Sequence, residues 1–557
     1  MERRQILWIR LERTLLSAPR GFKMSYRIAR SRAVAFLQCL ALLLAITLCF
    51  AASVRAAGIE DTVGGTVGLG RAAYFARVND FMAILQNPAN LAVVPGGKNG
   101  GNFGLELRLP VLTACFNRAR VEGVTYKDPG SSTGYRGEES FDKVCNDAYP
   151  GPTANLGWAQ SFDDKWGYGL GVFTPAAVGS NKYGSDTIVT VLPREDEQFT
   201  PTLTGTESPN RQMGLERDGA IAFVMLGLAA APLPFVRFGV SVGWGFANVY
   251  NKSVVSVLGG TFADQEVINE LRVRDRVIPK MTGSVVVTPL PWLDLFAVGN
   301  YQGDIEGKGE IKLTANGISG APLRACGAEN PGSRCKIPDV RLHVPFPTME
   351  AVFGARISVP RAGKKGRVLD PIKDEILDME LDVSWAQTSK VDEFKVNIHG
   401  KRVTDSGSPK VQFANAPADA DPPVERSPIR QTTSIPKNWK DTWTVRAGGD
   451  LNLVPGRFTV RGGISFATSA IDPRNMNIDY WPVRKLGLHA GATIGITERI
   501  RFHIAYAHLF YQDTVVLTGT GNVKDIASVN EVAATAVNEG SYRAGLDVFS
   551  AQINASF

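Results

Sequence analysis

The chain contains many short segments in which apolar residues alternate strictly with polar or small ones. In the clearest segment, 235–247, the apolar positions are Val236, Phe238, Val240, Val242, Trp244 and Phe246. Because successive side chains of a β-strand point to opposite faces, such a segment has one apolar and one polar face. The same alternation recurs at 380–385, 457–466 and 486–497. Segments of about ten residues are long enough for a tilted strand to cross a bilayer.

Alternation is equally typical of a soluble β-sandwich, so the connections between strands must distinguish the two folds. We predict strands near 101–112, 153–162, 166–175, 218–231, 235–250, 272–288, 292–305, 346–359, 378–389, 441–454, 457–467, 485–496, 500–512 and 542–557. Short links at 163–165, 232–234, 289–291, 454–456 and 497–499, with a longer one at 360–377, alternate with much longer links. Short turns at one end and long loops at the other are typical of outer-membrane barrels. The sequence therefore predicts an all-β fold, a closed 14-stranded antiparallel transmembrane β-barrel.

The first residues have the pattern of an export signal. Arg27, Arg30 and Arg32 precede an uncharged apolar run at 33–52, and small residues at 54 and 56 form a cleavage pattern. We expect residues 1–56 to be a signal peptide, with Met24 as an alternative start. The other interpretation of the apolar run is an uncleaved helical anchor.

The formal net charge of +7 is misleading, because residues 1–56 hold ten Lys or Arg and two acids, a net of +8. The expected mature chain therefore carries 7 − 8 = −1. A nucleic-acid partner is not expected at this charge.

Four cysteines remain after the expected cleavage, at positions 115, 145, 326 and 335. In an oxidising compartment we expect two disulfides, Cys115–Cys145 and Cys326–Cys335, each within a long loop. Zinc is the rival interpretation, but neither pair has the two-residue spacing of a zinc site. No metal and no cofactor is expected.

Several ordered motifs resemble one family of proteins. They are Ala57-Gly58-Ile59, GLGRA at 68–72, Asn87-Pro88-Ala89, WGYGLGVFTP at 166–175, VPFP at 344–347, ELDVSWAQTSKVDEF at 380–394, WKDTWTVRAG at 439–448, RFHIAYAHLF at 501–510 and INASF at 553–557. Together they resemble the FadL family of outer-membrane long-chain fatty acid transporters, which includes the aromatic-hydrocarbon uptake channels. Two positions depart from that family, since Asn79-Asp80 stands where paired acids are common and Ile59 stands where an aromatic residue is common.

The resemblance implies a small helical plug, or hatch, at 57–98 inside a barrel at 99–557. It implies that a hydrophobic ligand crosses passively, that the plug rearranges on binding, and that a kink in the third strand opens the wall for lateral release. The plug and gating residues would be Ala57, Gly58, Ile59, Gly70, Arg71, Asp80, Asn87, Pro88 and Ala89, and the kink residues Gly167, Gly169, Gly171 and Pro175. Glycine and proline occur where strands bend, although these glycines could equally make room for side chains in the lumen.

Charged residues on the polar faces would lie in the lumen. Arg237, Arg356, Arg461 and Arg501 are placed toward the periplasmic end, beside the plug. A buried charge needs a partner, so we expect these arginines to pair with plug carboxylates such as Asp80 and with one another. The alternative is that one of them binds the carboxylate of a fatty acid.

The predicted function is outer-membrane transport of long-chain fatty acids or aromatic hydrocarbons. A general diffusion porin is the alternative. The apolar segment 57–95 argues against it, because this segment would pack inside the barrel as a plug. An outer-membrane hydrolase is less favoured, because His508 shares a face with Tyr506 and Phe510 and fits an aromatic belt better than a catalytic site. Expected partners are a hydrophobic small molecule, outer-membrane lipid and lipopolysaccharide, and the barrel assembly machinery, with Phe557 as the assembly signal.

Overall fold

A computed structural model describes residues 64–94, 100–119, 143–147, 151–174, 181–183, 190–192, 202–204, 210–256, 266–315, 335–362, 370–398, 410–411, 427–428, 432–524 and 536–557. Ala57, Gly58, Ile59, Pro175 and Cys326 lie outside these residues, as do the expected signal peptide and cleavage site. Among the described residues, no helix is both long and apolar enough to cross a membrane.

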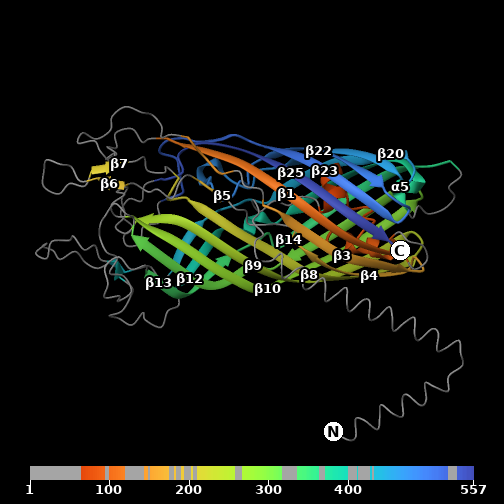
Figure 1. The fold of residues 1–557 in the computed structure, drawn as a ribbon, viewed down its shortest axis with the longest axis horizontal. Coiled ribbons are helices and arrows are strands. Elements are labelled where there is room, and N and C mark those ends of the chain that lie inside the picture. Colours follow the sequence, from red (N-terminus) through yellow and green to blue (C-terminus); the bar gives the residue numbers. More distant parts are fainter. Residues whose placement is uncertain are drawn as a thin grey trace, which may run out of the picture. The chain divides into compact units, whose positions relative to one another are not determined.

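The fold is a closed antiparallel barrel of fourteen strands, which confirms the predicted fold class (Figure 1). In chain order the strands are β1 (Gly101–Arg118), β3 (Thr153–Phe162), β4 (Trp166–Phe173), β8 (Glu216–Leu233), β9 (Val236–Ser256), β10 (Glu266–Leu290), β11 continued by β12 (Leu293–Gln302 and Ile305–Ala315), β13 continued by β14 (Cys335–Val344 and Met349–Pro360), β15 continued by β16 (Glu375–Ala386 and Glu393–Ile398), β19 continued by β20 (Thr432–Pro436 and Thr442–Val454), β21 (Phe458–Ala467), β22 (Lys485–Gly495), β23 (Ile500–Tyr511) and β25 (Gly540–Ser556). Each pairs with its neighbours in the chain, and β1 pairs with β25 from Asn102↔Ser556 to Arg118↔Gly540. This last pairing closes the sheet, so the barrel formed by the described strands has no open edge.

The remaining elements are short. β2 (Val144–Cys145), β5 (Asn181–Lys182) and β24 (Thr514–Val516) extend the edges of the barrel strands, and two further pairs are β6 (Thr190–Leu192) with β7 (Thr202–Thr204) and β17 (Lys410–Val411) with β18 (Ser427–Pro428). The helices are α3 (Gly65–Arg71), α4 (Ala83–Gln86), η1 (Pro88–Val93), α5 (Pro371–Asp374), η4 (Thr388–Lys390) and η5 (Pro473–Asn475).

The two faces of the barrel wall follow the alternation of the sequence. Outward residues such as Leu107, Trp244 and Phe353 are 49%, 60% and 56% exposed, while the inward Arg237 and Ser241 are each 1% exposed. A closed barrel with an apolar outer belt and polar residues inside has the surface that a lipid bilayer requires.

The wall extends further on one side than the sequence predicted. We expected a strand at 292–305 followed by a long loop, but β12 and β13 continue the wall beyond it. In this extension the pattern inverts, because Val273, Val340 and Leu342 point inward and are buried while charged residues face outward. An outer face of this composition suits water rather than hydrocarbon.

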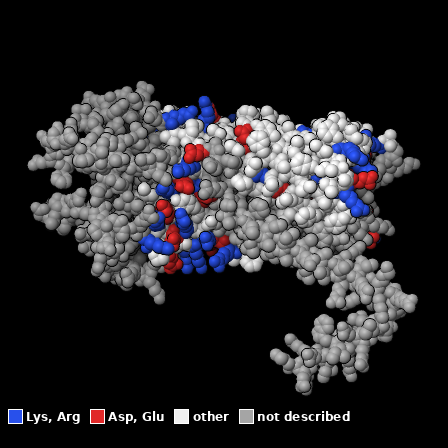
Figure 2. Space-filling model, in the orientation of Figure 1, with Lys and Arg blue, Asp and Glu red and all other residues white. Residues whose placement is uncertain are grey.

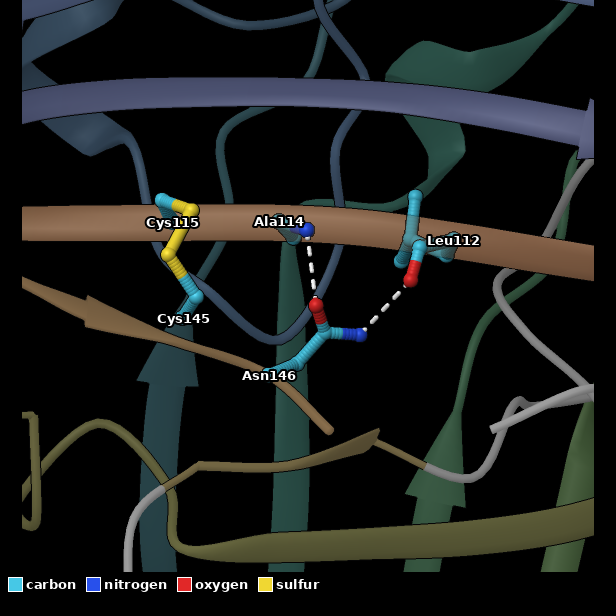
Figure 3. The surroundings of a disulfide bond; sticks show 5 residues. All are labelled: Leu112, Ala114, Cys115, Cys145 and Asn146. Atoms are coloured by element: carbon cyan, nitrogen blue, oxygen red, sulfur yellow. Dashed lines mark hydrogen bonds between the residues drawn. A yellow bond between two sulfur atoms is a disulfide. The ribbon is translucent and has the colours of Figure 1, made fainter. Parts of the chain in front are cut away.

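A disulfide fastens the first loop to the barrel rim. Cys115 of β1 is bonded to Cys145 of β2, and Asn146 beside it accepts a hydrogen bond from the Ala114 N–H at 2.7 Å and donates one to the Leu112 carbonyl at 2.9 Å (Figure 3). The other expected pair cannot be placed, because Cys326 is outside the described residues.

Candidate functional site

Residues 64–94, which we call the plug, are enclosed by the barrel strands. Apart from Gly64 and Asn79, every residue of the plug is buried. Helix α3 packs against β20–β23 and β25, and η1 packs against β3, β4, β8, β9 and β10. The plug therefore bridges opposite walls of the lumen.

Glycines in the wall leave room for the plug backbone. A Cβ atom at Gly448 or Gly463 would lie 1.7 or 2.1 Å from the Arg71 carbonyl oxygen, and one at Gly239 would lie 2.1 Å from the Ala89 nitrogen. One at Gly167 would lie 1.9 Å from the Leu91 carbonyl oxygen. No side chain fits at these distances, so we call Gly167, Gly239, Gly448 and Gly463 the glycine seats of the plug.

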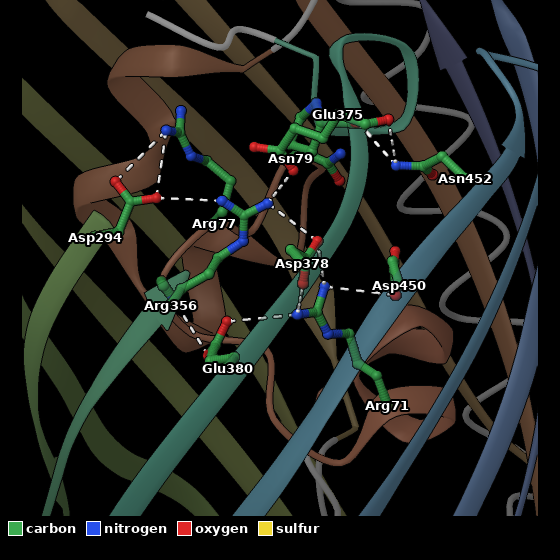
Figure 4. Close-up of polar contacts among 12 residues, drawn as sticks. Arg71, Arg77, Asn79, Asp294, Arg356, Glu375, Asp378, Glu380, Asp450 and Asn452 are labelled. Atoms are coloured by element: carbon green, nitrogen blue, oxygen red, sulfur yellow. Dashed lines mark hydrogen bonds and ion pairs between the residues drawn. The ribbon is translucent and has the colours of Figure 1, made fainter. Parts of the chain in front are cut away.

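Arg71, the last residue of α3, is the main ionic anchor of the plug (Figure 4). Its guanidinium is paired with Asp378, lies 3.5 Å from Asp450 Oδ1 and lies 3.8 Å from Glu380 Oε2. All four side chains are buried. Buried charges of opposite sign thus compensate one another here, as the cost of removing each of them from water requires.

The ion pairs continue across the lumen. Arg356 is paired with Glu375 and lies 3.0 Å from Asp378 and 3.3 Å from Asp294. Arg77 of the plug and Arg237 of β9 also reach Asp294, at 3.3 and 3.5 Å. We call the connected set the arginine–carboxylate network; its members are Arg71, Arg77, Arg237, Arg356 and Arg461 with Asp294, Glu375, Asp378, Glu380 and Asp450.

Backbone contacts add to this anchoring. Glu380 Oε1 accepts hydrogen bonds from the N–H groups of Phe75 and Ala76 at 2.6 and 3.2 Å. At the other wall, the Ala89 N–H donates to Ser284 Oγ at 2.9 Å. Asn87 holds the plug turn together by donating to the Phe75 carbonyl at 2.7 Å.

Asp80 is held by neutral groups. Its carboxylate accepts hydrogen bonds from Gln552 Nε2 at 2.6 Å, Asn554 Nδ2 at 3.2 Å and the Met82 N–H at 2.9 Å. Burial raises the pKa of Asp80, and the hydrogen bonds offset this in part. The arginines expected to pair with Asp80 pair with barrel carboxylates, and the plug supplies cations of its own.

A cavity of about 250 Å³ lies in the lumen. Its lining includes the apolar rings of Phe346, Trp439, Tyr480 and Trp481 and the polar groups of Lys280, Glu350, Arg446, Ser465 and His489. Two of the polar groups touch the plug, because His489 Nδ1 is 2.8 Å from the Leu69 carbonyl and the Arg446 guanidinium is 5.9 Å from the centre of the Phe75 ring. A molecule in the cavity would thus contact side chains that also contact the plug.

The third strand is paired on both sides from Trp166 to Val172. β4 is in register with β3 from Phe162↔Trp166 to Leu156↔Val172 and with β8 from Trp166↔Ala230 to Phe173↔Phe223. A Cβ atom at Gly169 would lie 2.6 Å from Ile84 Cγ1 of the plug. Of the two interpretations of these glycines, the geometry at Gly167 and Gly169 favours room for the plug. The ladder is complete on both sides of β4 from residue 166 to 172.

The structure places the other predicted residues as follows. Arg461 lies 3.4 Å from Asp450, Arg501 is paired with Asp370, and a Cβ atom at Gly70 would lie 2.9 Å from the Arg461 side chain. Phe557 exchanges two backbone hydrogen bonds with Gly101 at the seam between β1 and β25, of 2.9 and 3.0 Å.

Sequence reasoning missed Arg77, Asp294, Glu375 and Asp378, which complete the network. Their signal was present, because Asp294 and Asp378 stand at alternate positions among apolar strand residues. This alternation could not identify their ion-pair partners, because the path of the plug determines which wall carboxylates lie next to an arginine.

His508 faces outward, away from the plug. Its Nδ1 is 2.7 Å from Asp547 Oδ1, to which Tyr506 also donates a hydrogen bond of 2.6 Å. Within the described residues, no serine contacts His508, so a Ser-His-Asp site is not formed there.

No protein-family model matches the sequence, and no curated protein matches it either. Solved structures do match. A Pseudomonas aeruginosa FadL homologue is 13% identical with a TM-score of 0.61, covering 90% of this chain and 99% of its own. The Pseudomonas putida toluene transporter TodX is 13% identical with a TM-score of 0.53, covering 89% and 99%, and the Ralstonia pickettii toluene transporter TbuX is 12% identical with a TM-score of 0.52, covering 88% and 98%. The chain therefore has the fold of the FadL-type outer-membrane channels.

Proposed function

We propose that this protein imports hydrophobic compounds, long-chain fatty acids or aromatic hydrocarbons, across a bacterial outer membrane by ligand-gated passive diffusion. The observation that carries the proposal is a lumen occupied by a buried, ionically anchored plug with a part-apolar cavity beside it. The fold shared with a FadL homologue and two toluene transporters supports the same class of ligand. No energy source is needed, since the ligand moves down its gradient.

The proposed gate works through side chains shared by the cavity and the plug. A ligand that displaces Arg446 or His489 changes contacts with Phe75 and Leu69, and so shifts the balance between docked and undocked plug. A ligand can shift such an equilibrium only by binding the two states with different affinity. The contacts of Arg446 and His489 with the plug provide this difference in affinity.

A general diffusion porin requires a water-filled path. The buried plug argues against it, because residues 65–78 and 80–94 fill the lumen rather than line it.

A ligand could also leave the barrel sideways, through a gap in its wall. Release at β4 between residues 166 and 172 would have to break a ladder that is complete on both sides.

Export and assembly belong to the same proposal. We propose that residues 1–56 are removed as a signal peptide and that Phe557, which packs at the closing seam, is read by the barrel assembly machinery. Replacing Phe557 with Ala should slow assembly in cells while the folded barrel keeps its stability in detergent.

The decisive experiment measures uptake in cells that lack their own transporter and express this chain. Saturable uptake of radiolabelled oleate or toluene without flux of small sugars would support the proposal. Trp481→Ala, in the cavity wall, should reduce uptake several-fold, whereas Trp443→Ala, 53% exposed on the outer face of β20, should not. Sugar flux without hydrophobe uptake would replace the proposal with a porin.

A further inference from the structure

Three cations lie side by side on the outer face of the wall extension. Arg274 of β10 is directly opposite Lys308 of β12, and Lys308 is directly opposite Arg341 of β13. All three side chains are exposed, while their neighbours Val273, Val340 and Leu342 point inward. We call Arg274, Lys308 and Arg341 the cation row. Like charges directly opposite one another destabilise a sheet, so the row favours a bound anion.

Three other outward cations of the barrel have acidic partners. Lys312 lies 3.4 Å from Glu270, Lys336 lies 2.6 Å from Glu310, and Arg543 lies 2.9 Å from Asp513. By contrast, no described residue forms an ion pair with any member of the cation row. The row thus differs from these three paired cations.

The surroundings of the row are mixed in charge but remain cationic along β10. Arg272 and Arg276 flank Arg274 on the same strand, and the guanidinium of Arg272 lies 4.9 Å from the centre of the Tyr250 ring. On β12, Glu306 and Glu310 flank Lys308, and Glu310 is engaged by Lys336. Figure 2 shows this charged region beside the uncharged outer belt.

The height of the row matches the surface of the bilayer. Trp244, 60% exposed, donates its indole N–H to the Arg276 carbonyl at the bulge where β10 shifts register. Tryptophan is enriched where hydrocarbon meets headgroups. Arg274 lies two residues from Arg276, roughly 7 Å along the strand and away from the apolar belt, which is where headgroups lie.

We propose that the cation row binds the phosphate groups of lipopolysaccharide in the outer leaflet. A phosphomonoester carries up to two negative charges, and arginine can hold it by paired hydrogen bonds. The row consists of a lysine with one arginine on each side, and it spans three strands. Its three side chains can bind one phosphate together or two phosphates on neighbouring molecules. The inference depends on the proposed outer-membrane location but not on transport.

The test uses the purified full-length chain in detergent and measures lipopolysaccharide binding by native mass spectrometry. The test variant is Arg274→Ala/Lys308→Ala/Arg341→Ala, and the control is Lys312→Ala/Lys336→Ala/Arg543→Ala, which removes the same charge from paired sites. We expect the test variant to bind at least tenfold more weakly and the control to stay within about twofold of the parent chain. Equal losses in both variants would overturn the proposal, because nonspecific electrostatic attraction to the positive charges would then explain binding.

Three further arms do not depend on the triple variant folding. Enzymatically dephosphorylated lipopolysaccharide should bind the unmodified chain at least tenfold more weakly than the intact form; equal binding would show that phosphate is not recognised. Phosphatidylglycerol and inorganic phosphate should compete poorly, and competition as strong as that of lipopolysaccharide would overturn the assignment. Lys308→Glu, a single change, should weaken binding without preventing the heat-modifiable gel shift of a folded barrel.

Discussion

At the residue scale, Arg71 is the ionic anchor on which we expect docking of the plug to depend. It faces three buried carboxylates, those of Asp378, Glu380 and Asp450. Removing one partner of a buried ion pair costs roughly 3–5 kcal/mol, since the charge left behind stays desolvated. Arg71→Ala should therefore undock the plug and admit small sugars, measured by swelling of liposomes that contain the barrel.

Two further variants separate this effect from general damage. Arg71→Ala/Asp378→Asn should recover part of the closed state, because one of the stranded carboxylates becomes neutral. Arg543→Ala breaks only an exposed ion pair and should leave sugar flux unchanged. If Arg71→Ala stays impermeable while folded, the ionic anchor is dispensable.

We expect Asp80 to make plug docking depend on pH. Its folded-state pKa is raised by burial, so the docked state binds the proton more tightly than the undocked state does. Docking is then most stable below the ordinary aspartate pKa of about 3.9 and weakens as the pH rises through the raised value. Asp80→Asn should remove this dependence, measured between about pH 3 and pH 8 as the rate of maleimide labelling of Ala83→Cys divided by the rate for a free thiol at the same pH. An unchanged pH profile in Asp80→Asn would assign the dependence to another group.

At the element scale, the backbone of the plug rests on the glycine seats of the barrel wall. Gly239→Val would drive a side chain into η1, because its Cβ would lie 2.1 Å from the Ala89 nitrogen. Gly283→Val on the neighbouring strand is the matched control, since no atom lies within 4 Å of its Cβ position. We expect sugar flux through the first variant and none through the second. If the Gly239→Val barrel stays impermeable to sugars, η1 is not essential for closing the lumen.

The wall at β4 provides a second test at this scale. Leu170 and Leu226 are directly opposite each other on β4 and β8 and face outward. Because the ladder is already closed here, a disulfide in Leu170→Cys/Leu226→Cys should leave hydrophobe uptake within about twofold of the reduced form. Loss of uptake that returns on reduction would show that ligands leave by separating these strands.

Much of the barrel could be predicted from sequence, because the alternation within each strand shows which residues face outward and which face inward. Val240 and Trp244 mark the outer face, and Arg237 marks the inner one, within a single strand. The partners of the lumen charges could not be predicted, since Arg71 and Asp378 are brought together only by the path of the plug. The extension β12–β13 was missed for another reason. Its outward residues are charged, whereas a search for membrane strands looks for apolar outward faces.

At the scale of the whole molecule, the plug also balances the charge of the lumen. The arginine–carboxylate network contains five arginines and five acids, and the plug supplies two of the arginines, Arg71 and Arg77. Deleting residues 57–94 would leave three arginines against five acids on the wall. A water-filled lumen with that excess of acids attracts cations.

We therefore expect the deletion variant to assemble as an open pore that prefers cations and no longer discriminates for hydrophobes. The reversal potential in a planar bilayer under a KCl gradient measures this preference. Adding Asp378→Asn/Glu380→Gln to the deletion should abolish most of it, because these two changes equalise arginines and acids in the network. A pore that prefers anions would show that other lumen charges dominate, and a deletion variant that still excludes sugars would show that the barrel is closed by something other than the plug.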